Sequence, residues 1–241
     1  MSETPRLPRF FVDPPLTVGP LALSGNEAHH LMHVLRLESG SRVSLFDGTG
    51  QESSAVVISV NRHAVILEAE SPVASTRDCA ISLTVAVSLP KADRQKFLIE
   101  KLTELGVSTL VPLVTRRGVA QPTLSAIERL RKGVIAASKQ CGRNTLMNIG
   151  EAARPTELIG NFADSPARFF AHPGPENRKL RIAPETTEAI VAIGPEGGFD
   201  ESEVALFTAH GWVSASLGHT ILRVETAAIA VATLICIGQI D

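Results

Sequence analysis

The clearest candidate for chemistry in this chain is the glycine-rich segment 194–199 (GPEGGF). An apolar run typical of a strand precedes it, and Asp200 and Glu203 form a capping-box pattern for a helix that follows. A glycine-rich turn from a strand into a helix exposes backbone N–H groups and lets a ligand approach closely. The spacing is neither GxGxxG nor that of a P-loop, so the standard nucleotide-binding motifs are excluded. A ligand-binding loop and a tight turn without a ligand are the two interpretations at this point.

A second candidate is the segment 217–227 (LGHTILRVETA), where a loop enters an apolar helix. Arg223 and Glu225 are the only Lys, Arg, Asp or Glu residues between Glu203 and Asp241. Charged side chains are seldom buried without a partner, so we expect these two to pair with each other or with a ligand. A purely structural ion pair is the alternative, because a carboxylate also suits the N-terminus of a helix.

Positive charge is concentrated in the middle of the chain. Residues 77–149 hold 12 Lys or Arg against 5 Asp or Glu, while the whole chain has a net charge of −2. Such an excess is typical of an anion-binding face, although solvated helix surfaces would give the same pattern. The chain has nine Phe, one Trp and no Tyr, which disfavours an aromatic platform that stacks single-stranded bases. Any bound RNA should therefore be held mainly through its phosphates and its shape.

Histidine and cysteine give little support for a metal or redox site. His29 and His33 have the i, i+4 spacing of a possible metal pair, but the chain contains no HExxH and no CxxC motif. The motif of a hydrolase nucleophile elbow, GxSxG, is also absent. The odd, scattered set of Cys79, Cys141 and Cys236 fits a reducing compartment.

The first third of the chain predicts a small β-barrel with one helix. Alternating and β-branched runs separated by turn residues are typical of short strands. The expected strands are 9–12, 42–46, 54–60 and 64–70, the expected helix is 26–37 with Ser24 or Asn26 as its N-cap, and the expected linker is 71–78.

The rest of the chain predicts an α/β domain with a mostly parallel sheet, because apolar strands alternate with amphipathic helices. Ser125 and Glu128 form a capping-box pattern at the start of one helix, and Gly106 is placed to end another. The longest apolar run, 227–237, is shorter than the ~18 residues of a membrane span, and 1–15 has no apolar region of a secretory signal. The expected strands are 80–89, 107–114, 167–172 and 189–194, and the expected helices are 91–105, 126–140, 201–210 and 226–237.

Six segments, in order and with matching spacing, resemble the bacterial RsmE family of 16S ribosomal RNA (uracil-N3) methyltransferases, members of the SPOUT class. The segments are 9–12 (RFFV), 29–50, 89–107, 138–144 (SKQCGRN), 193–199 and 217–228. The resemblance implies a PUA-like β-barrel RNA-binding domain over 1–74 and a SPOUT α/β methyltransferase domain with a trefoil knot over 75–241. It further implies a cytoplasmic homodimer, without metal or membrane, that holds S-adenosylmethionine in the knot near the subunit boundary.

The resemblance also assigns roles to residues. Catalytic roles are expected for Arg223 and Glu225 because they are isolated charges in an apolar, glycine-rich setting. The residues expected to bind S-adenosylmethionine are Phe170, Ala171, His172, Ile193, Gly194, Pro195, Glu196, Gly197, Gly198, Leu217, Gly218, Ile221, Leu222, Arg223 and Thr226. Those expected to bind RNA are Arg9, His30, Arg36, Lys91, Arg94, Arg116, Gln140 and Arg143.

The implied reaction is methylation of N3 of a specific uridine near the decoding centre of 16S ribosomal RNA, on the assembled small subunit. This chain departs from the common family pattern at Lys139, His219, Thr220 and Val224. Two alternatives stay open. One, supported by His219 and Thr220, is a non-catalytic RNA-binding or ribosome-assembly factor with a degenerate knot. The other is a methyltransferase of the same fold that acts on transfer RNA.

Overall fold

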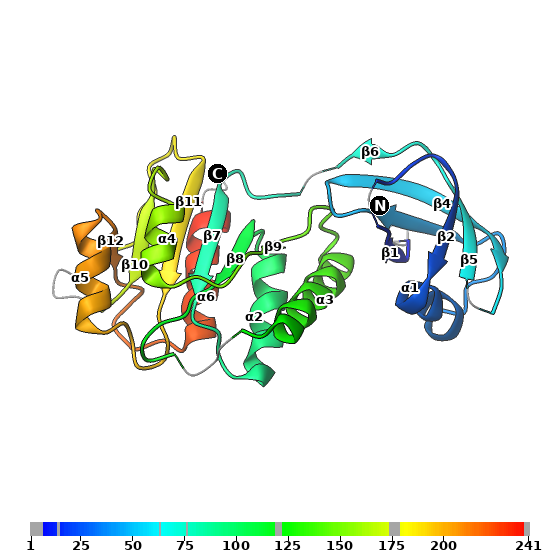
Figure 1. The fold of residues 1–241 in the computed structure, drawn as a ribbon. Coiled ribbons are helices and arrows are strands. Elements are labelled where there is room, and N and C mark those ends of the chain that lie inside the picture. The colour runs from blue at the N-terminus through cyan, green and yellow to red at the C-terminus, as the bar shows by residue number, and fades with distance from the viewer. Residues whose placement is uncertain are drawn as a thin grey trace. The chain divides into compact units, whose positions relative to one another are not determined.

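The computed structural model describes residues 7–13, 15–62, 64–75, 77–118, 122–173 and 179–238. The chain divides into two compact units (Figure 1). The first unit is Met1–Arg77 together with Ser138–Leu146, and the second is Asp78–Ala137 together with Met147–Asp241. The segment 138–146, which the sequence analysis groups with the α/β part, thus belongs to the first unit.

The first unit is built on a six-stranded sheet with the order β1-β3-β4-β5-β2 and with β6 paired to β4. Its only parallel pair among the described strands is β1 with β3. Helix α1 packs on β2 and β5 and continues directly into a π-helical segment, η1. The elements are β1 (Arg9–Phe11), β2 (Gly19–Ser24), α1 (Gly25–His29), η1 (His30–Val34), β3 (Arg42–Phe46), β4 (Gln51–Val60), β5 (Ala64–Ala69) and β6 (Val73–Ala74).

Alternation along the strands creates the core of this unit. In β5, Val65, Leu67 and Ala69 are buried, while Ile66 is only partly buried and Glu68 is exposed. Phe10 from β1 and Leu31 from η1 join the same cluster with no exposed surface. Full burial of a Leu or Phe side chain contributes about 1.5–3 kcal/mol, so these contacts hold the helix on the sheet.

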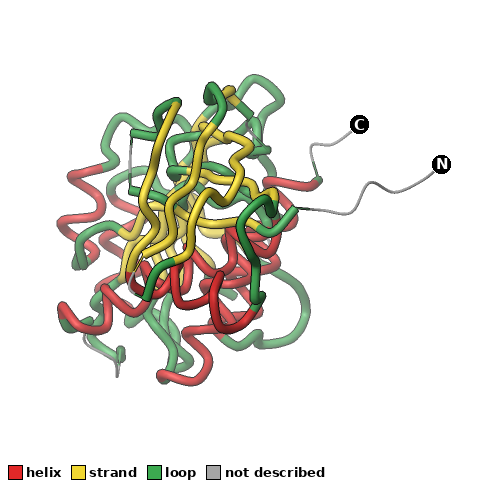
Figure 2. The backbone as a smooth tube through the Cα atoms, turned by 90° about the vertical axis from the view of Figure 1, so that its right-hand side faces the viewer, coloured by secondary structure: helices red, strands yellow, loops and turns green. Residues whose placement is uncertain are grey.

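The second unit is an α/β layer structure around a parallel sheet with the order β12-β10-β11-β7-β8-β9. The central strands β7 and β11 are buried along nearly their whole length, as expected when helices cover both faces. Figure 2 distinguishes the helices from the strands along the backbone. The elements are β7 (Ser82–Val87), α2 (Ala92–Glu104), β8 (Thr109–Pro112), α3 (Leu124–Cys141), β9 (Asn148–Ile149), α4 (Pro155–Asn161), β10 (Arg168–Ala171), β11 (Glu188–Ile193), α5 (Glu201–Ala209), β12 (Val213–Ala215), α6 (Val224–Ala232) and the π-helical η2 (Thr233–Ile237).

An aromatic cluster supports the edge of this sheet. Phe170 from β10 stacks on Phe207 from α5 with ring centroids 5.3 Å apart, and Phe199 meets both rings edge-on. Trp212 completes the cluster at 5.0 Å from Phe207. Because all four side chains are buried, the cluster fixes the loop after β11 against α5.

The structure confirms the predicted β-rich first part and the parallel α/β part, with local differences. As predicted, Gly106 ends α2: it follows the C-cap residue Leu105 and has a φ of 89°. The predicted cap at Ser125 is wrong, because α3 starts earlier and the Thr123 hydroxyl accepts the N–H of Ala126. The sequence analysis missed β2, β6, β9, α4 and β12, which are short or largely exposed.

Candidate active site

A cavity of about 290 Å³ opens in the second unit where the strands β10, β11 and β12 end. Its walls are small or apolar side chains and glycines from three loops, and Arg117 contributes a charge at the rim. Cavities that bind small molecules in proteins typically measure about 300–1,000 Å³ and are mostly apolar. The carboxyl ends of parallel strands are also where α/β proteins place their ligands. The cavity is therefore the candidate ligand site of this unit.

The first wall is the loop 194–198 between β11 and α5. Gly198 has a φ of 68°, a conformation that favours glycine, and its N–H donates to the carbonyl of Pro195 at 2.8 Å. No other atom lies within 4 Å of the position a Cβ would take at Gly198 or at Gly218, so both glycines leave open space beside the cavity. Asp200 then caps α5, and the predicted capping box with Glu203 is confirmed.

Arginines hold this loop from outside. Arg117 donates to the carbonyl oxygen of Gly197 at 2.8 Å. Arg94, in the first turn of α2, donates to Glu196 at 3.2 Å and forms an ion pair with Glu225 at 3.5 Å. The side chain of Arg116 lies 3.3 Å from the carboxylate of Asp200. Three arginines thus contact the loop 194–198 or the N-cap residue of α5 that follows it.

Glu225 and Arg223 do not pair with each other. Glu225 is buried in the first turn of α6, and its charge partner is Arg94. Its Oε2 atom accepts no hydrogen bond within the described part of the chain. Arg223 is the exposed N-cap residue of α6, and the described residues offer its side chain no hydrogen bond or ion pair. Of the two expected alternatives, the mutual pair is not found, because the ion-pair partner of Glu225 is Arg94.

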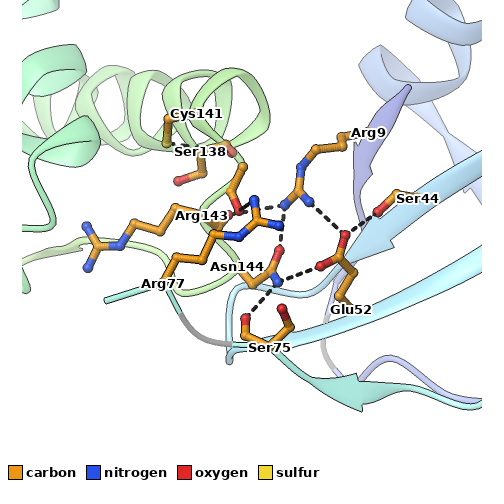
Figure 3. Close-up of polar contacts among 10 residues, drawn as sticks. Arg9, Ser44, Glu52, Ser75, Arg77, Ser138, Cys141, Arg143 and Asn144 are labelled. Atoms are coloured by element: carbon orange, nitrogen blue, oxygen red, sulfur yellow. Dashed lines mark hydrogen bonds and ion pairs between the residues drawn. The ribbon is translucent and has the colours of Figure 1, made fainter. Parts of the chain in front are cut away.

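A polar network in the first unit surrounds Arg9, which the sequence analysis expected to bind RNA. The guanidinium of Arg9 donates to Glu52 at 2.9 Å and to Asn144 at 2.6 Å, and it lies 4.7 Å from the centre of the Phe46 ring (Figure 3). The Asn144 amide donates to Glu52 at 2.9 Å and to the carbonyl of Ser75 at 2.7 Å. Arg9 is therefore a structural residue that ties the segment 138–146 to the sheet, rather than a surface cation.

The network also sets the charge of Glu52. Burial raises the pKa of this carboxyl, but the hydrogen bonds from Asn144 and Ser44 and the charge of Arg9 outweigh burial, so the pKa lies below the usual 4.5. The carboxylate is ionised at neutral pH, and the network depends on that charge.

A second contact between the same segments involves Lys139. Its ammonium donates to both carboxylate oxygens of Glu27 at 2.9 Å, lies 3.4 Å from Nδ1 of His30, and sits 5.3 Å from the centre of the Phe10 ring. Burial, followed by the charge of Lys139, lowers the pKa of His30 below 6.5. His30 is thus held neutral beside a cation at neutral pH.

The structure gathers most of the predicted cofactor residues around the cavity. The exceptions are Phe170, whose side chain is 1% exposed in the aromatic cluster, and Arg223 and Thr226, which lie outside the lining. The lining residues that the sequence analysis expected are Ala171, His172, Ile193, Gly194, Pro195, Glu196, Gly197, Gly198, Leu217, Gly218, Ile221 and Leu222.

Other lining residues were missed. Arg117 stood in the sequence only as one half of a basic pair, while Thr220 and Val224 were noted only as departures from a family pattern. Adjacency to the predicted loops is the signal that could have found several of them. The missed residues are Arg117, Pro173, Phe199, Ala215, Ser216, Thr220, Val224 and Ala227.

The predicted RNA-binding residues fall into two groups. Arg9 and Arg143 are buried, with Arg143 only 4% exposed, and Arg94 bridges two carboxylates. His30 is half-buried against Lys139. The exposed members are Arg36, Lys91, Arg116 and Gln140.

No group of three or more His, Cys, Asp or Glu side chains in the described residues is arranged to hold a metal ion. Among the helices that the structure describes, none is long and apolar enough to cross a membrane.

Comparison with known proteins identifies the family. Residues 77–236 match the family model of an RNA methyltransferase domain, and residues 23–70 match that of an RNA methyltransferase PUA domain. The chain is 34% identical, over 86% of its length and 84% of the relative's, to ribosomal RNA small subunit methyltransferase E of Rickettsia conorii. The chain belongs to the ribosomal RNA small subunit methyltransferase E family.

Solved structures of similar proteins agree with this family. A putative methyltransferase of Legionella pneumophila, in complex with the bound cofactor SAM, has a TM-score of 0.90 at 27% identity and covers 97% of this chain and 98% of its own. Ribosomal RNA small subunit methyltransferase E of Neisseria gonorrhoeae, bound to S-adenosyl methionine, has a TM-score of 0.87 at 27% identity and covers 95% and 96%. The predicted PUA and methyltransferase fold of this RNA methyltransferase is confirmed, whereas the trefoil knot stays a prediction.

Proposed function

We propose that this protein methylates N3 of a specific uridine near the decoding centre of 16S ribosomal RNA, with S-adenosylmethionine as the methyl donor and the assembled small subunit as substrate. The observation that carries the proposal is the cavity at the ends of β10, β11 and β12, which is lined by the glycine-rich loops of an RNA methyltransferase family member. Relatives with the same fold hold S-adenosylmethionine.

The lining fits that cofactor in its chemistry. Gly198 and Gly218 border open space, and the walls formed by Ile193, Leu217 and Leu222 are apolar, which suits an adenine ring and its ribose. Backbone amides and carbonyls of the loops 194–198 and 217–222 would hold the polar edge of the ring. Arg117 and Glu196 also line the cavity and would contact the charged amino-acid end of S-adenosylmethionine.

The chain's own charges account for the reaction. S-adenosylmethionine supplies a methyl group bound to a positively charged sulfur. The uracil N3 must lose its proton as the N3–methyl bond forms and the methyl–sulfur bond breaks, which leaves a neutral thioether. Arg223 is the cation that would stabilise the developing N3 anion, and Glu225 is the carboxylate that would accept the N3 proton directly or through a water molecule. Oε2 of Glu225 is buried, accepts no hydrogen bond from the described residues, and lies 3.5 Å from Nη1 of Arg94, which holds the carboxylate in place.

RNA contacts are assigned to the exposed predicted residues. Arg36, Lys91, Arg116 and Gln140 would meet the phosphates and shape of the ribosomal RNA. Arg9 and Arg143 are left out of this set because both are buried. Since the proposed substrate is a ribosomal subunit, we place the protein in the cytoplasm.

A homodimer is part of the proposal. In the second unit, Ile221 is 90% exposed beside the cavity, and Leu234 and Ile237 of η2 are 51% and 44% exposed. Large exposed apolar side chains are typical of a subunit interface. A second copy would bury them.

The test of this function compares substrates. Purified protein is incubated with radiolabelled S-adenosylmethionine and with small subunits that lack the modification, free 16S ribosomal RNA, or transfer RNA. Methyl incorporation into small subunits alone supports the proposal. Incorporation into transfer RNA would favour the related methyltransferase, and cofactor binding without any incorporation would favour the non-catalytic factor.

A further inference from the structure

Arg94 joins the two loops that form the cavity. Its Nη1 atom lies 3.2 Å from Oε1 of Glu196 in the loop after β11 and 3.5 Å from Oε2 of Glu225 in the first turn of α6. Glu196 lines the cavity, and Glu225 lies between the lining residues Val224 and Ala227. A single guanidinium group, anchored on α2, therefore connects both walls.

The two carboxylates differ in their surroundings. The Glu196 side chain is 47% exposed, so water can solvate it without help. The Glu225 side chain is 8% exposed, and its Oε2 atom accepts no hydrogen bond from the described residues, which leaves Arg94 as the charge beside it. A buried carboxylate without a counter-charge is strongly unfavourable, so the position of Glu225 depends on Arg94.

The anchor of Arg94 is itself rigid. The residue after it, Gln95, is buried and donates to the carbonyl of Pro90 at 2.8 Å, while Arg129 donates to its side-chain oxygen at 3.3 Å. The first turn of α2 is thus fixed from both sides. A guanidinium on a fixed turn can set the distance between two acidic partners, whereas one on a mobile loop could not.

We propose that Arg94 is a positioning residue of the methyl-transfer site, which acts through Glu225 and Glu196 and does not itself bind RNA phosphate. It holds the Glu225 carboxylate at the start of α6 and holds the loop 194–198 at the cofactor cavity. This inference rests on the proposed function for its catalytic meaning, while the link between the two walls can be tested without any substrate.

The alternative role for Arg94 is a contact with an RNA phosphate, as the sequence analysis expected. The guanidinium of Arg94 already faces two carboxylates, and a phosphate would have to displace at least one of them. Displacement would leave Glu225 buried without its counter-charge. Lys96 lies on the same helix and is exposed, so Lys96→Gln is a matched loss of charge that touches neither carboxylate.

The experiment combines two measurements on Arg94→Gln, Arg94→Lys, Glu225→Gln, the double variant Arg94→Gln/Glu225→Gln and the control Lys96→Gln. Calorimetry gives the Kd for S-adenosylmethionine, and hydrogen exchange gives the protection of the loop 194–198 and of the start of α6. We expect Arg94→Gln to weaken cofactor binding about tenfold and to loosen both segments, with Lys96→Gln unchanged. Arg94→Lys keeps the charge but not the planar guanidinium, so its Kd for S-adenosylmethionine should lie between those of the original protein and Arg94→Gln.

The double variant decides whether Arg94 acts through Glu225. In the Glu225→Gln background, Arg94→Gln should raise the Kd for S-adenosylmethionine by a factor at least threefold smaller than in the original protein, because the buried charge is gone. Equal costs in both backgrounds, or unchanged exchange in the loop and at α6, would overturn the inference. Failure of the proposed function has a different signature, since the original protein would then transfer no methyl group to small subunits, although Arg94→Gln would still change the exchange of the loop 194–198 and of the start of α6.

Discussion

Replacing Arg9 with methionine should destabilise the first unit far more than the loss of a typical surface arginine. The change keeps the aliphatic stem but removes the guanidinium, with its hydrogen bonds to Glu52 and Asn144 and its position over the Phe46 ring. The Arg9 side chain is 6% exposed and that of Glu52 is 23% exposed, so the pair is screened little by water. Removing one partner of such a pair typically costs about 3–5 kcal/mol, because the other charge stays buried.

The pH dependence follows from the pKa of Glu52. Burial raises this pKa, but hydrogen bonds from Asn144 and Ser44 and the Arg9 charge bring it below 4.5. A lowered carboxyl pKa stabilises the folded state above the unfolded value, and this stabilisation is lost as the pH falls through the folded value. The difference between the original protein and Arg9→Met should therefore be full at pH 7 and should shrink well below pH 4.5.

Native-state hydrogen exchange is the suitable assay. The single tryptophan, Trp212, lies in the second unit and the chain has no tyrosine, so fluorescence does not report on the first unit. Protection of amides in β3 and β4, corrected for intrinsic exchange, gives the opening free energy of the first unit. The control is Arg42→Met, because Arg42 and Glu70 form an ion pair with side chains 58% and 60% exposed, worth about 0–1 kcal/mol. A cost of Arg9→Met as small as that of Arg42→Met, or one that does not decline at all as the pH is lowered from 7 until the unit unfolds, would contradict this prediction.

Two further predictions concern His30 and the cavity loop. Burial and the Lys139 charge lower the pKa of His30 below 6.5, so stability of the first unit should fall as the pH drops through 6.5, and His30→Gln should flatten this dependence in urea denaturation. Equal slopes for both proteins would contradict it. Gly198→Ala should weaken binding of S-adenosylmethionine more than Gly197→Ala in calorimetry, because Gly198 has a φ of 68° while a Cβ at Gly197 would meet Arg117 at an ordinary 3.5 Å. Similar affinities for the two variants would show that loop conformation does not control the cavity.

Local chemistry made part of the site predictable from sequence. The capping box of Asp200 and Glu203 and the glycine-rich turn before it depend on residues within a few positions of one another. Apolar runs likewise predicted β7 and β11, because strands covered on both faces need apolar residues at every position. Such features do not require knowledge of distant contacts.

Distant pairing made the rest unpredictable. Glu225 pairs with Arg94, which is far away in the chain, although Arg223 is its nearest charged neighbour in sequence. The segment 138–146 resembles a cationic helix end in sequence, but Asn144 and Lys139 anchor it to the first unit through Arg9 and Glu27. A charge on an expected helix indicates a surface residue only until its partner is known. The exposed cations assigned to RNA were separated from the structural ones by burial, which a single sequence does not give.

The departures from the family pattern have defined positions in the structure. Thr220 and Val224 line the cavity, His219 is exposed beside it, and Lys139 is paired with Glu27. Lys139 thus has a structural partner in this chain. Since Thr220 and Val224 form part of the cavity wall, they are the residues to exchange if cofactor affinity differs from that of relatives.

The central claim is tested most directly by the chemical identity of the product. Small ribosomal subunits that lack the modification are incubated with the purified protein and S-adenosylmethionine, and the digested 16S ribosomal RNA is examined by mass spectrometry. We expect a new 3-methyluridine in the original protein's product and its loss with Glu225→Gln. A methyl group on another base or on a ribose, or no methyl group on RNA despite bound cofactor, would contradict it.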